Sequence, residues 1–188
     1  MLEILKENRS HRSFTPKEVT KEEMRSFIEG ARFSGTASNS QRVRFFIVDG
    51  ADMCDKVFGL VKFAGAIQWN PTLEESPRGY IAICASEPLN TTPESIAFDM
   101  GMCAQNILLM ASSKGYKGCL IGAYNKPAFD KLVNMPEGYK SYYLIALGEP
   151  KDKVTIVDAK DGITKYYRDI EANHHFVPKL SLDKLIIK

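Results

Sequence analysis

Residues 93–115 read PESIAFDMGMCAQNILLMASSKG, the clearest helical pattern in the chain. Pro93 and Glu94 suit the first turn of a helix, and Gly115 suits its end. Apolar side chains recur at helical spacing and predict a helix over about 94–114, at Ile96, Met100, Cys103, Ala104, Ile107, Leu108 and Ala111. Met102 and Met110 lie off this stripe. A helix that is apolar on more than one face is usually buried on several sides, so we expect it at the heart of a domain or at a dimer interface.

The segments around this helix indicate an α+β domain. Short apolar runs predict strands, at 44–48, 80–84, 119–121 and 142–147. The run 80–84 is apolar throughout, so we expect it at the centre of the sheet. Helical spacing predicts further helices, at 2–7, from a Thr20–Glu23 capping box to before Gly35, at 52–63 and at 127–133. We therefore expect one α+β domain over residues 1–188, with a four- or five-stranded sheet.

Composition excludes several classes of protein. The chain has 25 basic and 23 acidic residues, a balance that argues against a nucleic-acid binder. No apolar run approaches the roughly 20 residues that span a bilayer. The first seven residues alternate charge with apolar side chains, unlike a signal peptide, so we expect a soluble cytoplasmic protein. The four cysteines are widely spaced, and we expect them to be buried structural thiols.

The last segment, 151–188, differs from the rest because it is charged, lacks a clear period and ends in apolar residues. Such a segment cannot form its own core. We expect it to be an extended tail that lies across its own domain or across a partner subunit. The adjacent His174 and His175 would point to opposite faces of a strand, which argues against a metal site.

Two short segments carry the residues most suited to bind a ligand. Residues 8–14 hold two arginines, two serines and an aromatic ring, and can bind an anion. Residues 36–41 are small and amide side chains that can bond a flat polar ring. Two alternatives stay open at this point: Arg9 and Arg12 could be solvated charges after a helix, and Asn39 and Gln41 could be turn residues. No familiar catalytic motif is present, so an enzyme of this sequence would depend on a cofactor.

Taken in order, six motifs resemble the nitroreductase family of FMN-dependent oxidoreductases, in particular its short, compact branch. Residues 8–14 resemble the family's Arg-Arg-Ser-x-Arg-x-Phe opening, and residues 36–41 its Pro-Ser-Ala-x-Asn-x-Gln-Pro-Trp loop. The other similar segments are the central helix at 99–109, the turn at 115–122, the closing strand at 146–150 and the tail at 166–169 and 174–179. The resemblance covers nearly the whole chain.

This resemblance implies an α/β sandwich with a central, mainly antiparallel sheet flanked by helices. It also implies a domain-swapped homodimer with two FMN sites at the subunit interface, each built from both chains. The tail at 151–188 would embrace the other subunit.

The resemblance also assigns roles to individual residues. Arg9 and Ser10 would hold the FMN phosphate or ribityl chain, Lys179 would complete the phosphate cluster, and Arg12 would face the pyrimidine edge. The second subunit would supply Ala37, Ser38, Asn39 and Gln41. The flavin ring would lie beside Leu120, Ile121 and Gly122. Three residues depart from the family pattern. Asn8 and Leu180 replace cations that often surround the phosphate, so FMN affinity is expected to be lower, and Arg42, which stands where the family has proline, would partly compensate.

The implied reaction passes hydride from NAD(P)H through flavin N5 to a nitroaromatic, quinone or similar conjugated acceptor, without a catalytic side chain. The acceptor would enter a pocket lined by residues 62–75, including Phe63, Trp69 and Asn70. The alternatives are a flavin-binding sensor or carrier without efficient turnover, and a family member that modifies flavin or removes halogens. The choice between NADH and NADPH has no signature in this sequence.

Overall fold

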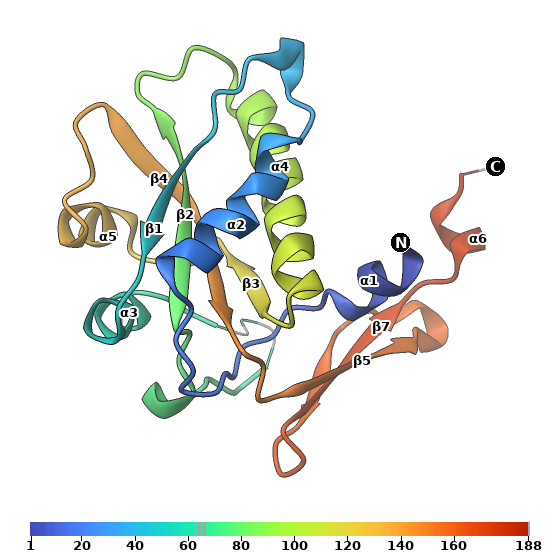
Figure 1. Cartoon of the computed structure of the whole chain (residues 1–188). Coiled ribbons are helices and arrows are strands. Elements are labelled where there is room, and N and C mark those ends of the chain that lie inside the picture. The colour runs from blue at the N-terminus through green and yellow to red at the C-terminus, as the bar shows by residue number, and fades with distance from the viewer. Residues whose placement is uncertain (64, 66, 188) are drawn as a thin grey trace.

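The structure, a computed structural model, describes residues 1–63, 65 and 67–187. Four strands form the central sheet in the order β1-β2-β4-β3, and every neighbouring pair is antiparallel. Helices α2 and α4 cover one face, and α3 and α5 cover the other (Figure 1). The strands are β1 (Arg44–Val48), β2 (Gly79–Ser86), β3 (Lys117–Ile121) and β4 (Tyr139–Gly148). The helices are α1 (Leu2–Glu7), α2 (Lys21–Arg32), α3 (Ala51–Phe58), α4 (Pro93–Ser113) and α5 (Lys126–Leu132). The predicted α/β sandwich with an antiparallel central sheet is confirmed.

Strand β2 lies inside the sheet, as its unbroken apolar sequence predicts. Ile81 and Ile83 enter the core beneath α2 and α4, whereas Ala82 and Cys84 enter the core beneath α3 and α5. Successive side chains of a strand point to opposite faces, so a strand covered on both sides must be apolar at every position. The two cores therefore account for the absence of alternation in residues 80–84.

Helix α4 is buried on one side and open on the other. Its apolar stripe packs on the sheet and on α2, and a Cβ at Gly30 of α2 would lie 2.8 Å from the carbonyl oxygen of Asn106. Glycine there lets the two helices approach closely. The remaining face carries Phe98, which is 71% exposed, and Met102. Within one chain this outer face has no apolar partner among the described residues of the core.

Two sequence predictions can be compared with the structure here, namely the extent of α3 and the state of the cysteines. The helix ends at Phe58, because Gly59 caps it and Val61 bridges to Tyr124, so the predicted extension to residue 63 is wrong. All four cysteines are buried and free, which confirms them as structural thiols. Burial raises the pKa of Cys54 and Cys84 to about 12, so neither is a thiolate at neutral pH.

Residues beyond 151 form a second, smaller sheet. Its strands β5 (Lys153–Asp158), β6 (Tyr167–Asp169) and β7 (His174–Lys179) are ordered β5-β7-β6, and the short helix α6 (Leu182–Leu185) follows. This sheet lies beside α1, away from α3 and α5 (Figure 1). The sequence did not predict these strands, and contact of the tail with another subunit stays a prediction. Among the described residues, no helix has the length and apolar character to cross a membrane.

Candidate functional site

A cavity of about 360 Å³ lies where residues 8–12, α4, β3 and the C-terminal sheet meet. Four residues predicted to bind a cofactor line it, namely Arg9, Ser10, Arg12 and Lys179. The other lining residues are Asn8, Gln105, Leu108, Gly118, Tyr166, His175 and Val177. The volume falls within the ~300–1,000 Å³ that small-molecule sites occupy. The chain reaches this place directly after α1, where it passes below the end of α4 (Figure 1).

Strand β3 fixes the backbone of the N-terminal segment. Ser10 forms a β-bridge with Gly118, and the backbone N–H of His11 donates to the carbonyl oxygen of Gly118 at 3.1 Å. A Cβ at Gly118 would lie only 2.4 Å from the carbonyl oxygen of Ala146, so no larger residue fits there. Sequence reasoning missed Gly118 as a site residue, although it lies inside the glycine-bounded turn at 115–122.

Three cations give the cavity a positive character. Arg9 donates to the carbonyl oxygen of Leu5 at 2.7 Å, while its buried Nε has no hydrogen-bond partner among the described residues. Burial lowers the pKa of the Arg9 guanidinium. Arg12 donates to the carbonyl oxygen of Ser10 at 3.1 Å, and Lys179 is exposed at the end of β7. None of the described lining residues carries a carboxylate, so the cavity suits an anion such as phosphate.

The second predicted segment, residues 36–41, lies elsewhere in the chain. Ser38, Asn39 and Gln41 are exposed and have φ angles of 53°, 51° and 47°, in the left-handed region. Gln41 Nε2 donates to Asn39 Oδ1 at 3.2 Å. The backbone N–H of Ala37 donates to Oδ1 of the buried Asp99 at 3.0 Å, which ties the loop to the first half of α4.

A single chain does not bring the two segments together. Asp99 precedes the cavity residues Gln105 and Leu108 on α4 by six to nine positions, which is roughly 9 to 14 Å of helix axis. In Figure 1 the loop lies beside the opposite end of α4 from the N-terminal segment. Arg42 lines a separate cavity of about 380 Å³ beside this loop rather than the cavity of Arg9.

The predicted ring-binding residues follow Gly118 at the end of β3. Leu120 is 40% exposed and points to the same face as Gly118, because alternate residues of a strand share a face. Ile121 is buried in the core on the other face, beneath α3 and α5. Gly122 is exposed just after the strand. None of the three lines the cavity itself.

A second cavity, of about 790 Å³, adjoins the first through Tyr166, which lines both. Trp69 lines the second cavity, as predicted for the acceptor pocket. Phe63 does not, because its ring is buried in the core at 5.9 Å from the ring of Phe58. Asn70 is exposed outside it. Residues 64 and 66 of the predicted pocket stretch lie outside the described residues.

His175 lines the first cavity and is almost fully buried. Its ring is 1% exposed and meets the edge of Trp69 at 5.5 Å between centroids. Burial, with the nearby Arg168 cation, lowers the pKa of His175 to about 4, so the ring is neutral at physiological pH. His174 points to the other face and bonds to Thr155 at 2.8 Å. The expected opposite orientation of the two histidines is confirmed.

The sequence is similar to one protein family and to several of its characterised or named members. A model of the nitroreductase family matches residues 5–87 and 86–149. The chain is 25% identical over 165 residues to an Archaeoglobus fulgidus protein provisionally named NADH dehydrogenase/NAD(P)H nitroreductase, covering 85% of this chain and 91% of that protein. It is 28% identical over 163 residues to the NADPH-flavin oxidoreductase of Vibrio harveyi, covering 79% of this chain and 65% of that protein.

The fold has counterparts among solved structures. A nitroreductase family protein from Streptococcus pneumoniae TIGR4 superposes with a TM-score of 0.72 at 18% identity, over 100% of this chain and 98% of that one. A family protein from Clostridium novyi NT superposes with a TM-score of 0.67, over 94% and 93% of the two chains. At 18% identity, these likenesses show the fold alone. The first match spans the whole chain, so it extends over the residues of the second sheet.

Proposed function

The chain belongs to the nitroreductase family, and from that premise we propose that it is an FMN-dependent oxidoreductase that carries hydride from NAD(P)H to an electron-poor aromatic or quinone acceptor. The observation that carries the proposal is the cavity in which Arg9, Arg12 and Lys179 meet with no carboxylate among its described lining residues. Two related proteins are named NAD(P)H nitroreductase and NADPH-flavin oxidoreductase, and these names support the same class of reaction.

The cavity fits the phosphate end of FMN. Guanidinium groups match phosphate oxygens in geometry, and the Ser10 hydroxyl can donate to the same oxygens. The buried Nε of Arg9, which has no partner among the described residues, is a donor that an anion would satisfy. Asn8 lines the cavity where the family commonly has arginine, so we expect weaker binding than three flanking arginines would give.

The flavin ring would require a second subunit. Asp99 anchors the loop 36–41, and Gln105 lines the phosphate cavity, so Met102 lies halfway between the two points on α4. If two copies of α4 pack antiparallel about a two-fold axis near Met102, the loop of each subunit approaches the cavity of the other. The exposed Phe98 and Met102 supply the apolar surface that such packing would bury.

When bound, FMN supplies the two-electron chemistry that links NAD(P)H to the acceptor. The chain's own residues would hold and tune it. Because Arg12 shares the phosphate cavity with Arg9 and Lys179, its guanidinium would bind the phosphate rather than the pyrimidine edge that the resemblance implies. The Ala37 to Gln41 loop of the other subunit would bond the polar edge of the ring. The second cavity, with Trp69 and Tyr167 among its lining residues, would accept a planar ring, which suits a nitroaromatic or quinone.

The proposal is tested by reconstitution with FMN, followed by measurement of stoichiometry, size and NAD(P)H oxidation with menadione or nitrofurazone. We expect a yellow dimer with two FMN and turnover with both acceptors. The double variant R9A/K179A should lose FMN binding, while the control K17A, an exposed cation outside the cavity, should retain it. Failure of the wild-type protein to bind FMN would overturn the proposal. Tight FMN binding without turnover would instead support a flavin sensor or carrier.

A further inference from the structure

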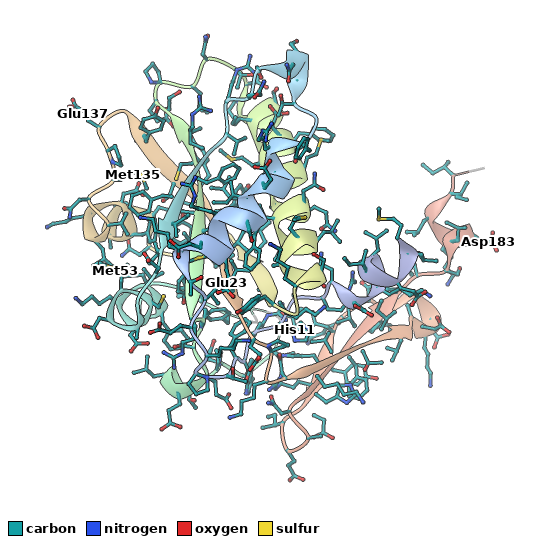
Figure 2. The ribbon with its side chains drawn as sticks, viewed as in Figure 1. His11, Glu23, Met53, Met135, Glu137 and Asp183 are labelled. Carbon is teal, nitrogen blue, oxygen red and sulfur yellow. The ribbon has the colours of Figure 1, made fainter. Side chains whose placement is uncertain are left out.

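A buried carboxylate lies behind the cavity wall without lining it. The side chain of Asp152 has no exposed surface, its Oδ1 accepts from His11 Nδ1 at 2.8 Å, and its Oδ2 accepts from the backbone N–H of Arg12 at 3.2 Å. These two bonds hold the backbone of Arg12 and the side chain of His11, the residue between the cavity-lining Ser10 and Arg12. Figure 2 shows His11 at the junction between the central sandwich and the C-terminal sheet.

The same carboxylate faces the C-terminal sheet. Arg168 Nη1 and His175 Nε2 each lie 3.7 Å from Asp152 Oδ2, and both side chains are almost fully buried. The Arg168 guanidinium also stacks on Trp69, 3.7 Å from the ring centroid. One aspartate therefore connects the N-terminal segment, strands β6 and β7, and the wall of the second cavity.

We propose that Asp152 is a positioning residue for the phosphate half of the site. It fixes residues 10–12 in the backbone conformation that directs Ser10 and Arg12 into the cavity. This inference rests on the proposed function, because it takes the phosphate of FMN to be the bound anion. Asp152 lines neither cavity, so it acts only through the residues that it holds.

The sign of its effect separates positioning from simple electrostatics. A buried negative charge near an anion site repels a phosphate, so its removal alone should tighten FMN binding. Loss of positioning has the opposite consequence, because a displaced Arg12 or Ser10 no longer meets the phosphate oxygens. Weaker binding after neutralisation is therefore the signature of a positioning role.

The test compares FMN with riboflavin, which has the same ring and ribityl chain but no phosphate. Dissociation constants are measured by quenching of flavin fluorescence for the wild type, D152N and E149Q. Glu149 is the matched control, because it is a nearby carboxylate whose partners Thr15 and Lys17 lie outside the cavity. We expect D152N to weaken FMN binding about tenfold, the effect of a lost charge-assisted hydrogen bond, and to leave riboflavin binding within about twofold. E149Q should change neither.

A second variant guards against misfolding of D152N. H11N weakens the same clamp from the opposite side and leaves the Asp152 charge in place, so it should also weaken FMN binding selectively, by less. Far-UV circular dichroism checks both variants. If the wild type binds FMN but folded D152N and H11N bind it as tightly or more tightly, this inference is wrong and the proposed function stands. If the wild type binds neither flavin, the proposed function itself fails.

Discussion

The two halves of the candidate site, residues 8–12 and the loop 36–41, are each held by a buried aspartate, but the two aspartates have different partners. In each, a buried aspartate accepts a backbone N–H, Asp152 from Arg12 at 3.2 Å and Asp99 from Ala37 at 3.0 Å. Asp152 also has His11 and Arg168 nearby. Asp99 has no ion pair among the described residues, and its Oδ2 has no hydrogen-bond partner there.

The side chains of the two segments differ more sharply. Residues 8–12 face a cavity that their own chain completes. In the loop 36–41 the amide side chains are exposed to solvent. Three of its residues, Ser38, Asn39 and Gln41, have backbone angles in the left-handed region. Such backbone conformations cost about 1–3 kcal/mol each and persist mainly where function requires them. The difference supports the proposal of a site shared between two chains, in which the cavity is lined within one chain and the exposed loop would contact the other.

Mixing two inactive variants would test this division most strongly. R9A/K179A damages the cavity, and N39A/Q41A damages the loop, so each pure protein should bind little FMN. If the halves come from different subunits, a mixed dimer has one doubly damaged site and one intact site. Random mixing makes about half of the dimers mixed, so about a quarter of wild-type binding should return. FMN content after joint unfolding and refolding measures it.

A control for this experiment places all four substitutions in one chain and mixes it with wild-type chains. Each mixed dimer then has two half-damaged sites and should bind little FMN. The wild-type dimers in this mixture, about a quarter of the total, still bind FMN, so the control should also give about a quarter of wild-type binding if the sites are shared. If the loop and the cavity of one chain act together instead, the first mixture should recover little FMN and the control about half, and that result would contradict a site shared between subunits.

The two aspartates should differ in their contribution to folding. D152A leaves Arg168, whose side chain is 3% exposed, as a buried cation without its carboxylate, which typically costs about 3–5 kcal/mol. D99A removes one hydrogen bond to a charged group, for about 1.5–3 kcal/mol. Urea unfolding of the apoprotein at a fixed protein concentration gives both values. A larger loss for D99A would show that the Asp152 cluster stabilises the fold less than its burial implies.

Acid should destabilise the folded protein through His175, which lines the cavity. Its pKa is lowered to about 4 in the folded protein, against an ordinary value of about 6.5. The unfolded chain therefore binds the extra proton first, and stability that is complete above pH 6.5 declines as the pH falls towards 4. The slope reaches up to about 1.4 kcal/mol per pH unit. In H175F this component should vanish, so matching pH profiles of unfolding for wild type and H175F would refute the assignment.

Much of the fold follows from local sequence. Residues 80–84 predict a buried strand because burial on two sides requires apolar residues at every position, and residues 93–115 predict a long helix because their apolar residues recur at helical spacing. The Thr20–Glu23 capping box is present as predicted, since both reciprocal bonds are short-range. The C-terminal strands escaped prediction because β6 has three residues and β5 and β7 are partly exposed, so neither period nor composition distinguishes them.

The site divides along the same line. Arg9, Ser10 and Arg12 were predicted because cations and a hydroxyl in a short motif are visible in sequence, Lys179 was predicted only through the family resemblance, and the structure gathers all four in one cavity. Asp152, Arg168 and His175 were not, because an isolated charge acquires meaning only from its partners. Asp152 and His11 are 141 positions apart, and only the folded chain brings them to 2.8 Å.

The smallest effect should separate the two segments by its sign. Ser38 has φ 53° and ψ 28°, where a residue with a Cβ is strained by about 1–2 kcal/mol. Glycine removes that strain but gives the unfolded chain about 0.4–1 kcal/mol of extra freedom. S38G should therefore raise the free energy of unfolding by less than about 1 kcal/mol. None of residues 8–12 has a positive φ, so S10G gains nothing and should destabilise by a similar amount. Thermal unfolding at one protein concentration compares the two. Destabilisation by both variants would mean that the left-handed backbone of the loop is not strained, so backbone strain would not distinguish the loop from the cavity segment.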